Sequence, residues 1–175
     1  KLALSCALIH RPRILILDEP TTGVDAVSRQ EFWEMLKKIR QEGITIMVST
    51  PYMDEAGLCD RVALMQKGRV LDVAVPGEIS RREQVPLFAL RSRKEVFPFL
   101  ERIRNMNGCR NAWLFGDELH VTLESRDAEP AIRAEVERWE DPTLVWTAIP
   151  ASIEDRFMRL IQREREIGNE NGSFT

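Results

Sequence analysis

Apolar residues follow two different patterns in the first half of the chain. Runs that are apolar at nearly every position, at 13–17 and 44–49, predict strands buried on both faces of a parallel sheet. Between them, residues 27–41 repeat apolar side chains at helical spacing, which predicts an amphipathic helix that stops at Gly43. The order strand, helix, strand predicts an α/β fold with a right-handed crossover. Functional groups are then expected at the carboxyl ends of the strands.

A different order of elements follows residue 82. Strands are expected at 86–92, 111–115, 118–124 and 143–149, and helices at 94–106 and 128–139. This β-α-β-β-α-β order is typical of a ferredoxin-like (α+β) unit, in which two helices cover a four-stranded antiparallel sheet. Ser152 is expected to cap one more helix.

These patterns divide the chain into four parts. We expect a parallel-sheet core at 1–84, a ferredoxin-like accessory domain at 85–150, a terminal helix at 151–167 and a flexible tail at 168–175. The core is also expected to contain a short helix at 52–58 and a hairpin that turns at Lys67-Gly68.

Composition narrows the class of protein. A chain that is 43% hydrophobic and 30% charged is typical of folded globular proteins. The 25 basic and 28 acidic side chains give a net charge of −3, so no basic excess indicates a nucleic-acid partner. Three irregularly spaced cysteines and two histidines predict reduced thiols in a cytosolic setting and neither a disulfide framework nor a zinc site. No apolar run approaches the roughly 20 residues of a membrane helix.

Two adjacent carboxylates, Asp18 and Glu19, end the first apolar strand. Charge at the end of a buried strand is costly unless a metal or a partner compensates for it. In a magnesium-nucleotide site, one carboxylate can hold the ion directly or through water, and its neighbour can accept a proton from the attacking water. The alternative is a helix-capping aspartate followed by a surface glutamate before a proline turn.

The sequence ILILDEPTTGVD, residues 14–25, resembles the Walker B strand, catalytic glutamate and D-loop of ABC transporter nucleotide-binding subunits, in uninterrupted order. Residues 1–12 resemble the helix that leaves the family's signature motif, residues 48–60 its switch strand and following helix, and residues 61–73 its closing hairpin. The resemblance implies part of a P-loop NTPase-type parallel sheet core in the first half. The second half resembles the accessory domain of subunits that export drugs or lipids.

The family resemblance also implies roles for individual residues. Asp18 would hold Mg²⁺ through water, Glu19 would polarise the attacking water as general base, and Asp25 would contact a second ATPase domain across the bound ATP. The full-length protein would bind and hydrolyse ATP and drive export through a membrane permease. It would lie at the cytoplasmic face of the cell membrane, with its ATPase domains paired as a homodimer, a heterodimer or a tandem.

The sequence departs from the family in two ways. Four parts of the family's ATP site are expected to precede Lys1: the phosphate-binding loop, the strand before it, the Q-loop and the complete signature motif. This polypeptide alone is therefore expected neither to bind Mg-ATP tightly nor to hydrolyse it. Pro51 stands where the family has a histidine that contacts the terminal phosphate, and proline offers no side-chain donor. Slow hydrolysis, or one inactive site of an asymmetric pair, is the resulting hypothesis.

Two other functions stay open at this point. In the first, the ferredoxin-like domain is a regulatory module that binds a ligand or protein, and the ATPase part is a non-catalytic scaffold. The second is an ABC protein that works on ribosomes or in DNA repair, which would be expected to carry long coiled or basic insertions. His10 and His120 have no neighbours at metal-ligand spacing, so we expect surface or structural roles for both.

Overall fold

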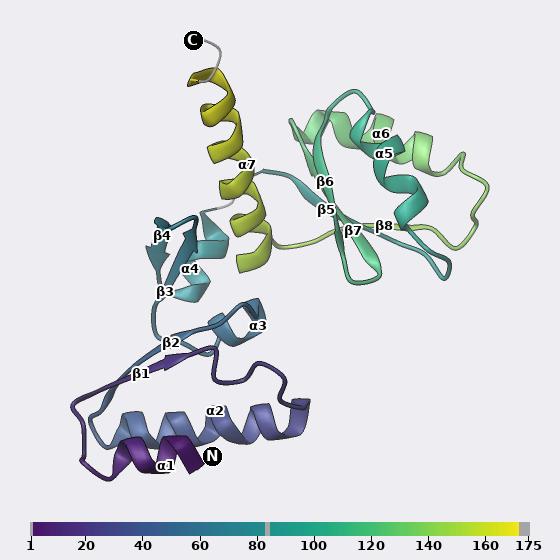
Figure 1. The fold of residues 1–175 in the computed structure, drawn as a ribbon. Coiled ribbons are helices and arrows are strands. Elements are labelled where there is room, and N and C mark those ends of the chain that lie inside the picture. Colours follow the sequence, from purple (N-terminus) through teal and green to yellow (C-terminus); the bar gives the residue numbers. More distant parts are fainter. Residues whose placement is uncertain (1, 83–84, 172–175) are drawn as a thin grey trace. The chain divides into compact units, whose positions relative to one another are not determined.

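The computed structural model describes residues 2–82 and 85–171 (Figure 1). These residues form two compact units, which divide between Val62 and Ala63. Helices and strands occur in both units, so the mixed α/β class expected from the sequence is confirmed. The domain limits expected at 84 and 150 stay predictions. Within the described ranges, no helix is both long and apolar enough to cross a membrane.

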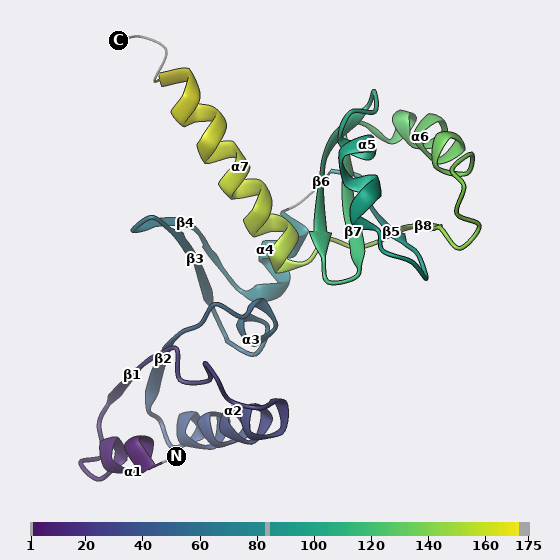
Figure 2. The same cartoon turned by 45° about the vertical axis from the view of Figure 1, so that its right-hand side comes forward.

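The first unit is built around a pair of parallel strands. Its elements are α1 (Leu2–Leu8), β1 (Ile14–Asp18), α2 (Ala26–Gln41), β2 (Thr45–Ser49) and α3 (Met53–Ala56). Strands β1 and β2 pair from Ile14 opposite Thr45 to Asp18 opposite Ser49. Helix α2 connects them and lies beside the strand pair (Figures 1 and 2). Their parallel carboxyl ends therefore meet at one edge.

The core of this unit lies on one face of the strand pair. Buried residues from α1, β1 and α2 form it, namely Leu4, Leu15, Trp33, Leu36 and Ile39. The opposite face carries Ile14, Ile16 and Met47, which are 62%, 71% and 62% exposed. The expectation that both strands are buried on both faces is therefore wrong for the described chain. Alternate side chains point to opposite faces of a strand, and α1 and α2 cover only one of them.

The second unit begins with a hairpin and continues into a larger sheet. Its elements are β3 (Val62–Gln66), β4 (Arg69–Ala74), α4 (Pro76–Arg81), β5 (Leu87–Arg91), a 3₁₀ turn (Phe97–Phe99), α5 (Leu100–Arg104), β6 (Cys109–Phe115), β7 (Glu118–Leu123), a second 3₁₀ turn (Arg126–Ala128), α6 (Glu129–Val136), β8 (Val145–Ala148) and α7 (Ile153–Asn171). Strands β5 to β8 form one antiparallel sheet in the order β6-β7-β5-β8.

Helices α5 and α6 cover one face of this sheet. Alternate residues of β7, Leu119, Val121 and Leu123, are fully buried against residues of both helices. The other face of β7 carries His120 and Thr122, which are also buried. Both faces of the central strand are thus out of water, and a buried imidazole lies among them. Such a polar group needs partners inside the fold.

Three helix boundaries differ from those expected. The helix expected at 94–106 is a 3₁₀ turn followed by the short α5, and the turn begins where Pro98 can occupy a first-turn position without losing a hydrogen bond. The helix expected at 128–139 ends at Val136 in α6. The terminal helix continues past residue 167 to Asn171, and residues 172–175 of the expected tail lie outside the described residues.

Candidate functional site

Asp18 and Ser49 end the two parallel strands side by side. They are register partners, and the Ser49 hydroxyl donates a hydrogen bond to Asp18 Oδ1. Beyond them, the backbone N–H of Glu19 reaches the Ser49 carbonyl oxygen at 3.0 Å and its Oγ at 3.1 Å. The structure therefore places both predicted carboxylates at the carboxyl end of β1, where the sequence predicted them, and both are exposed.

Glu19 has an unusual backbone conformation. Its φ is +43°, in the left-handed region that non-glycine residues rarely adopt. The two bonds to Ser49 hold this conformation, and the Thr22 hydroxyl donates to Glu19 Oε2 at 3.1 Å. Strained backbone that its surroundings hold in place is common at functional sites.

Asp25 caps the helix that follows the carboxylates. Its Oδ1 accepts hydrogen bonds from the backbone N–H groups of Val27 and Ser28, at 3.1 and 3.0 Å. The bond from Ser28 is the main cause of a pKa for Asp25 below its usual range. The structure thus gives Asp25 a structural task, the N-cap of α2, whereas its contact with a second ATPase domain stays a prediction.

Pro51 lies two residues beyond the end of β2 and is exposed. The structure therefore brings the segment that carries Pro51 to the same strand ends as Asp18 and Glu19. Among the described residues, no group of three or more His, Cys, Asp or Glu side chains could hold a metal ion. A cation at this edge would therefore depend on water and on a bound phosphate for most of its ligands.

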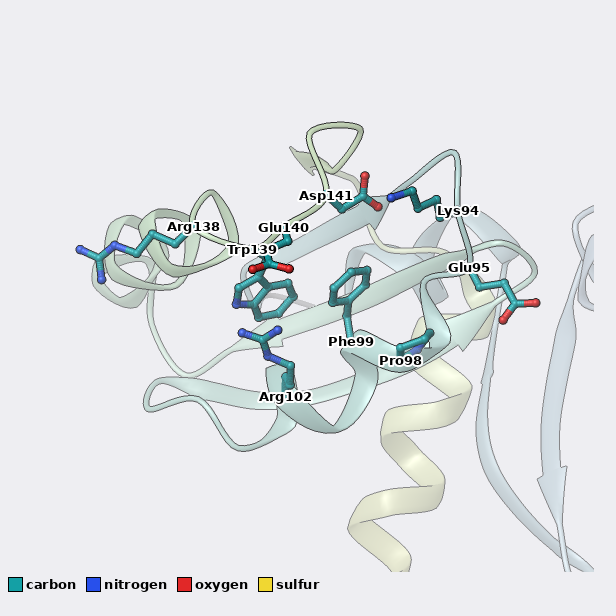
Figure 3. A pocket seen from close by; sticks show the side chains of 9 residues that line it. All are labelled: Lys94, Glu95, Pro98, Phe99, Arg102, Arg138, Trp139, Glu140 and Asp141. Carbon is teal, nitrogen blue, oxygen red and sulfur yellow. The ribbon is translucent and has the colours of Figure 1, made fainter.

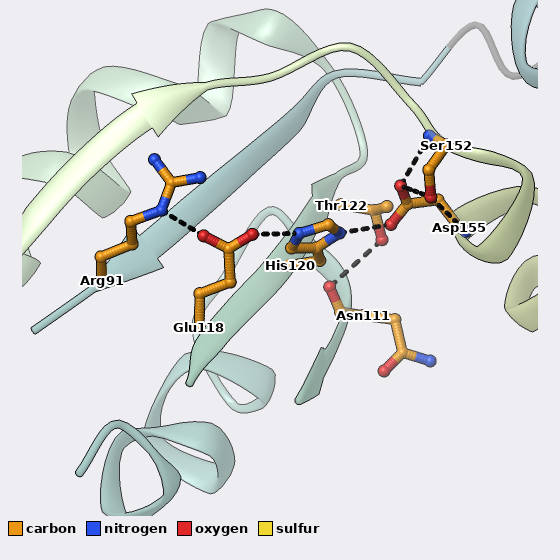
Figure 4. A network of polar contacts seen from close by, with 7 residues as sticks. All are labelled: Arg91, Asn111, Glu118, His120, Thr122, Ser152 and Asp155. Atoms are coloured by element: carbon orange, nitrogen blue, oxygen red, sulfur yellow. Dashed lines mark hydrogen bonds and ion pairs between the residues drawn. The ribbon is translucent and has the colours of Figure 1, made fainter. Parts of the chain in front are cut away.

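A second polar cluster, which was not predicted from the sequence, lies in the other unit (Figure 4). His120 is 8% exposed, its Nδ1 lies 2.6 Å from Asp155 Oδ1, and its Nε2 lies 2.8 Å from Glu118 Oε1. Arg91 binds the other oxygen of Glu118. The expectation that His120 is structural fits, but it does not lack partners. The spacing of Glu118 and His120, two residues apart on one strand face, was the available signal.

A groove opens on the helical side of the larger sheet (Figure 3). It has a volume of roughly 600 Å³ and contains no predicted site residue. The rings of Phe99 and Trp139 stack there with centroids 5.0 Å apart, and the Arg102 guanidinium lies 4.3 Å from the centre of the Trp139 ring. At its rim, hydrogen bonds from Ser92 and Thr143 lower the pKa of Asp141 to about 2. Phe99, Arg102, Trp139 and Asp141 thus all make contacts within the second unit.

Known proteins resemble the chain over nearly its whole length. Nod factor export ATP-binding protein I of Neorhizobium galegae is 33% identical over 176 residues, which cover 95% of this chain and 46% of that protein. The probable multidrug ABC transporter ATP-binding protein YbhF of Escherichia coli is 46% identical over 79 residues, 45% of this chain and 14% of that protein. The chain is similar to the ATP-binding proteins of ABC transporters.

The chain matches only part of each of these ABC proteins. The chain spans about half the length of the Nod factor export proteins that it matches. Among solved structures, cbiO1 from Clostridium perfringens, part of the ABC transporter complex cbiONQ, is 36% identical with a TM-score of 0.42, covering 45% of this chain and 32% of that chain. No protein-family model matches the chain.

Proposed function

We propose that the whole protein binds and hydrolyses ATP and couples hydrolysis to export through a membrane permease. One observation carries this proposal: Asp18 and Glu19 lie exposed at the carboxyl end of a parallel strand, beside the end of the neighbouring strand at Ser49. This is the edge at which α/β sheets bind ligands. The names of the relatives, an export protein and a multidrug transporter protein, support the same function.

The residues at this edge fit a Mg-ATP site. Mg²⁺ keeps several of its waters and is bound through one or two carboxylates together with substrate phosphates, so a single exposed carboxylate such as Asp18 suffices. Mg²⁺ would neutralise charge on the phosphates when bound. Glu19 is the proposed general base, and its bond from Thr22 orients the carboxylate without burying it. Asp25 is proposed to lie at the contact with a second ATPase domain.

Pro51 is proposed to weaken this site. At the position where the family has a histidine, its side chain offers no hydrogen bond to a terminal phosphate. Losing one donor to a charged group weakens stabilisation of the reacting phosphate. We therefore infer slow hydrolysis, or a pair of unequal sites in a heterodimer or tandem.

We propose that residues 85–150 form a ferredoxin-like accessory domain. The element order β5-α5-β6-β7-α6-β8 and the sheet order β6-β7-β5-β8 support this assignment, as does the placement of both helices against one face. The relatives do not favour the alternative in which this domain is the functional part and the ATPase part is a passenger. The protein is proposed to lie at the cytoplasmic face of the membrane, bound to its permease.

The first experiment measures the mass of the natural polypeptide that contains this sequence, by immunoblotting and intact mass spectrometry of its own cells. ATP hydrolysis by that polypeptide is then measured before and after Glu19→Gln, with Glu42→Gln at the exposed end of α2 as control. We expect Glu19→Gln to reduce kcat by at least about 100-fold, as for loss of a general base. Equal rates for the two variants would refute the proposed role. The 175-residue chain alone is expected to hydrolyse no ATP.

A further inference from the structure

Glu55 is a buried carboxylate outside the predicted set of site residues. It lies in α3, four residues beyond Pro51, and its side chain is 1% exposed. A carboxylate removed from water needs hydrogen bonds or a cation. Its surroundings within the first unit therefore indicate what it does.

One oxygen of Glu55 holds the loop that carries Pro51. The Thr50 hydroxyl donates to Glu55 Oε2 at 2.6 Å, and the same Thr50 oxygen accepts a hydrogen bond from the Tyr52 backbone N–H at 3.1 Å. The two bonds close a tight turn with Pro51 at its tip. Because Pro51 has no backbone N–H, these flanking bonds are the ones that define the turn.

The other oxygen of Glu55 faces a cation on α2. Arg29 Nε lies 3.7 Å from Glu55 Oε1, and neither atom has a hydrogen-bond partner among the described residues. The Arg29 guanidinium also lies 4.4 Å from the centre of the Tyr52 ring. The Glu55 side chain is buried and the Arg29 side chain is 26% exposed, so attraction between their charges is stronger than between two fully exposed groups. Arg29 thus contacts Tyr52 and Glu55, both of which follow Pro51 in the chain.

Arg29 also belongs to the first turn of the helix that Asp25 caps. Its backbone N–H donates to the Asp25 carbonyl oxygen at 2.9 Å. We propose that Arg29 and Glu55 are positioning residues that hold the Pro51 loop against the Asp25-capped start of α2, so that the two segments move together. This inference rests on the proposed function, which assigns Pro51 to the nucleotide and Asp25 to the second ATPase domain. The pair then links the nucleotide site to the domain contact.

The test uses a natural reporter and needs no nucleotide. Tyr52 is the single tyrosine of the chain, so 3-fluorotyrosine gives one ¹⁹F signal from the loop. Glu55→Gln removes the charge that faces Arg29 and keeps the side-chain size. Asp54→Asn is the matched control, because Asp54 lies 3.6 Å from the same arginine but is 73% exposed.

We expect Glu55→Gln to shift the ¹⁹F signal and to speed hydrogen exchange at the Tyr52 amide by roughly tenfold, while Asp54→Asn changes neither. Equal effects of the two variants, or no effect of either, would overturn the proposal. If circular dichroism shows that Glu55→Gln unfolds the first unit, hydrogen exchange at Tyr52 is measured in the variant Thr50→Val instead. It removes the hydroxyl and leaves Glu55, and unchanged Tyr52 exchange in that variant would also overturn the proposal.

A second readout in the full-length protein separates this inference from the proposed function. Glu55→Gln is expected to lower kcat for ATP several-fold more than Asp54→Asn does, with a smaller change in KM. If Glu19→Gln leaves hydrolysis intact, the proposed function fails, whatever the ¹⁹F and exchange data show. If Glu19→Gln abolishes hydrolysis and Glu55→Gln equals Asp54→Asn in all readouts, only the positioning role fails.

Discussion

His120 on β7 binds Asp155 in the first turn of α7, with 2.6 Å between Nδ1 and Oδ1. The second ring nitrogen, Nε2, lies 2.8 Å from Glu118 Oε1. When the two carboxyl groups are ionised, they can accept hydrogen bonds but cannot donate them. A neutral imidazole has one N–H, whereas imidazolium has two. The protonated ring therefore satisfies both partners, and it joins the terminal helix to the sheet.

The stability of the second unit should depend on the charge of this ring. Burial disfavours imidazolium, but the hydrogen bonds to Asp155 and Glu118 outweigh it and raise the pKa of His120. The contribution of protonated His120 to the stability of the fold is complete below pH 6.5, the ordinary pKa of histidine. It disappears as the pH rises through the higher folded-state pKa. Burial opposes ionisation of Asp155 and Glu118 too, yet hydrogen bonds to His120 lower the pKa of both carboxyls. The stability contributed by ionised Asp155 is present above pH 3.8, and that contributed by ionised Glu118 is present above pH 4.5. Each contribution is lost as the pH falls further, through the lower folded-state pKa.

We therefore expect the unfolding temperature of the second unit to be highest between pH 4.5 and 6.5 and to fall on the alkaline side. Thermal unfolding across pH, together with NMR titration of the imidazole, measures this. Arg91 also contacts Glu118, and the uncharged Ser152 hydroxyl donates to Asp155. The variant His120→Gln should remove the alkaline decline, and a decline of the same size in that variant would assign it to other groups.

Asp155 has a second task at the start of α7. Its Oδ2 accepts from the Ser152 backbone N–H at 2.8 Å, and Ser152 Oγ accepts from the Asp155 backbone N–H at 3.1 Å. This is a reciprocal capping box. We expect Asp155→Asn to lower the free energy of unfolding by roughly 2–4 kcal/mol, because it leaves a buried imidazolium without its partner. Urea denaturation measures this, and Glu154→Gln on the exposed side of the same turn should cost less than about 1 kcal/mol.

Gly108 has no room for a side chain. It has φ +87°, and an added Cβ would lie 2.5 Å from Ala128 Cβ. We expect Gly108→Ala to destabilise the chain by roughly 2–4 kcal/mol, through backbone strain plus overpacking. Gly116 is the control, because it has φ +58° but open space around it, so Gly116→Ala should show only the backbone part, about 1 kcal/mol. Equal losses in denaturation would mean that the Ala128 contact relaxes freely.

Pro51→His tests whether the missing donor limits hydrolysis. In the full-length protein, we expect this variant to raise kcat by about tenfold or more, the effect of one added donor to the reacting phosphate. The Thr50–Tyr52 hydrogen bond does not involve Pro51, so the loop should keep its turn. Steady-state ATPase rates at saturating Mg-ATP measure the effect. Unchanged kcat would remove the mechanism proposed for slow hydrolysis.

Local sequence patterns sufficed for most of the fold and for the position of the carboxylates. The helix expected at 27–41 is Ala26–Gln41, because its apolar spacing marks the helical stretch and the glycine after it marks its end. The hairpin around Gly116 was also predicted, since turn residues separate two alternating strands. Asp18 and Glu19 could be assigned to a strand end because the apolar run stops there.

Features that depend on distant residues could not be predicted in this way. The bond from His120 to Asp155 joins residues 35 positions apart, and no local spacing indicates it. The same holds for the Arg29–Glu55 contact, which a loop, a strand and a turn separate in sequence. The expected burial of both faces of β1 was wrong because an isoleucine-rich run shows that a strand is apolar, not what packs on each side.

The uncovered face of β1 and β2 is expected to promote self-association of the isolated chain in solution. Ile14, Ile16 and Met47 form an exposed apolar patch on a two-stranded ribbon, the kind of surface that associates with other copies of the chain. The apparent molecular mass of the isolated chain in light scattering should therefore increase with protein concentration. The variant Ile16→Lys should reduce this increase.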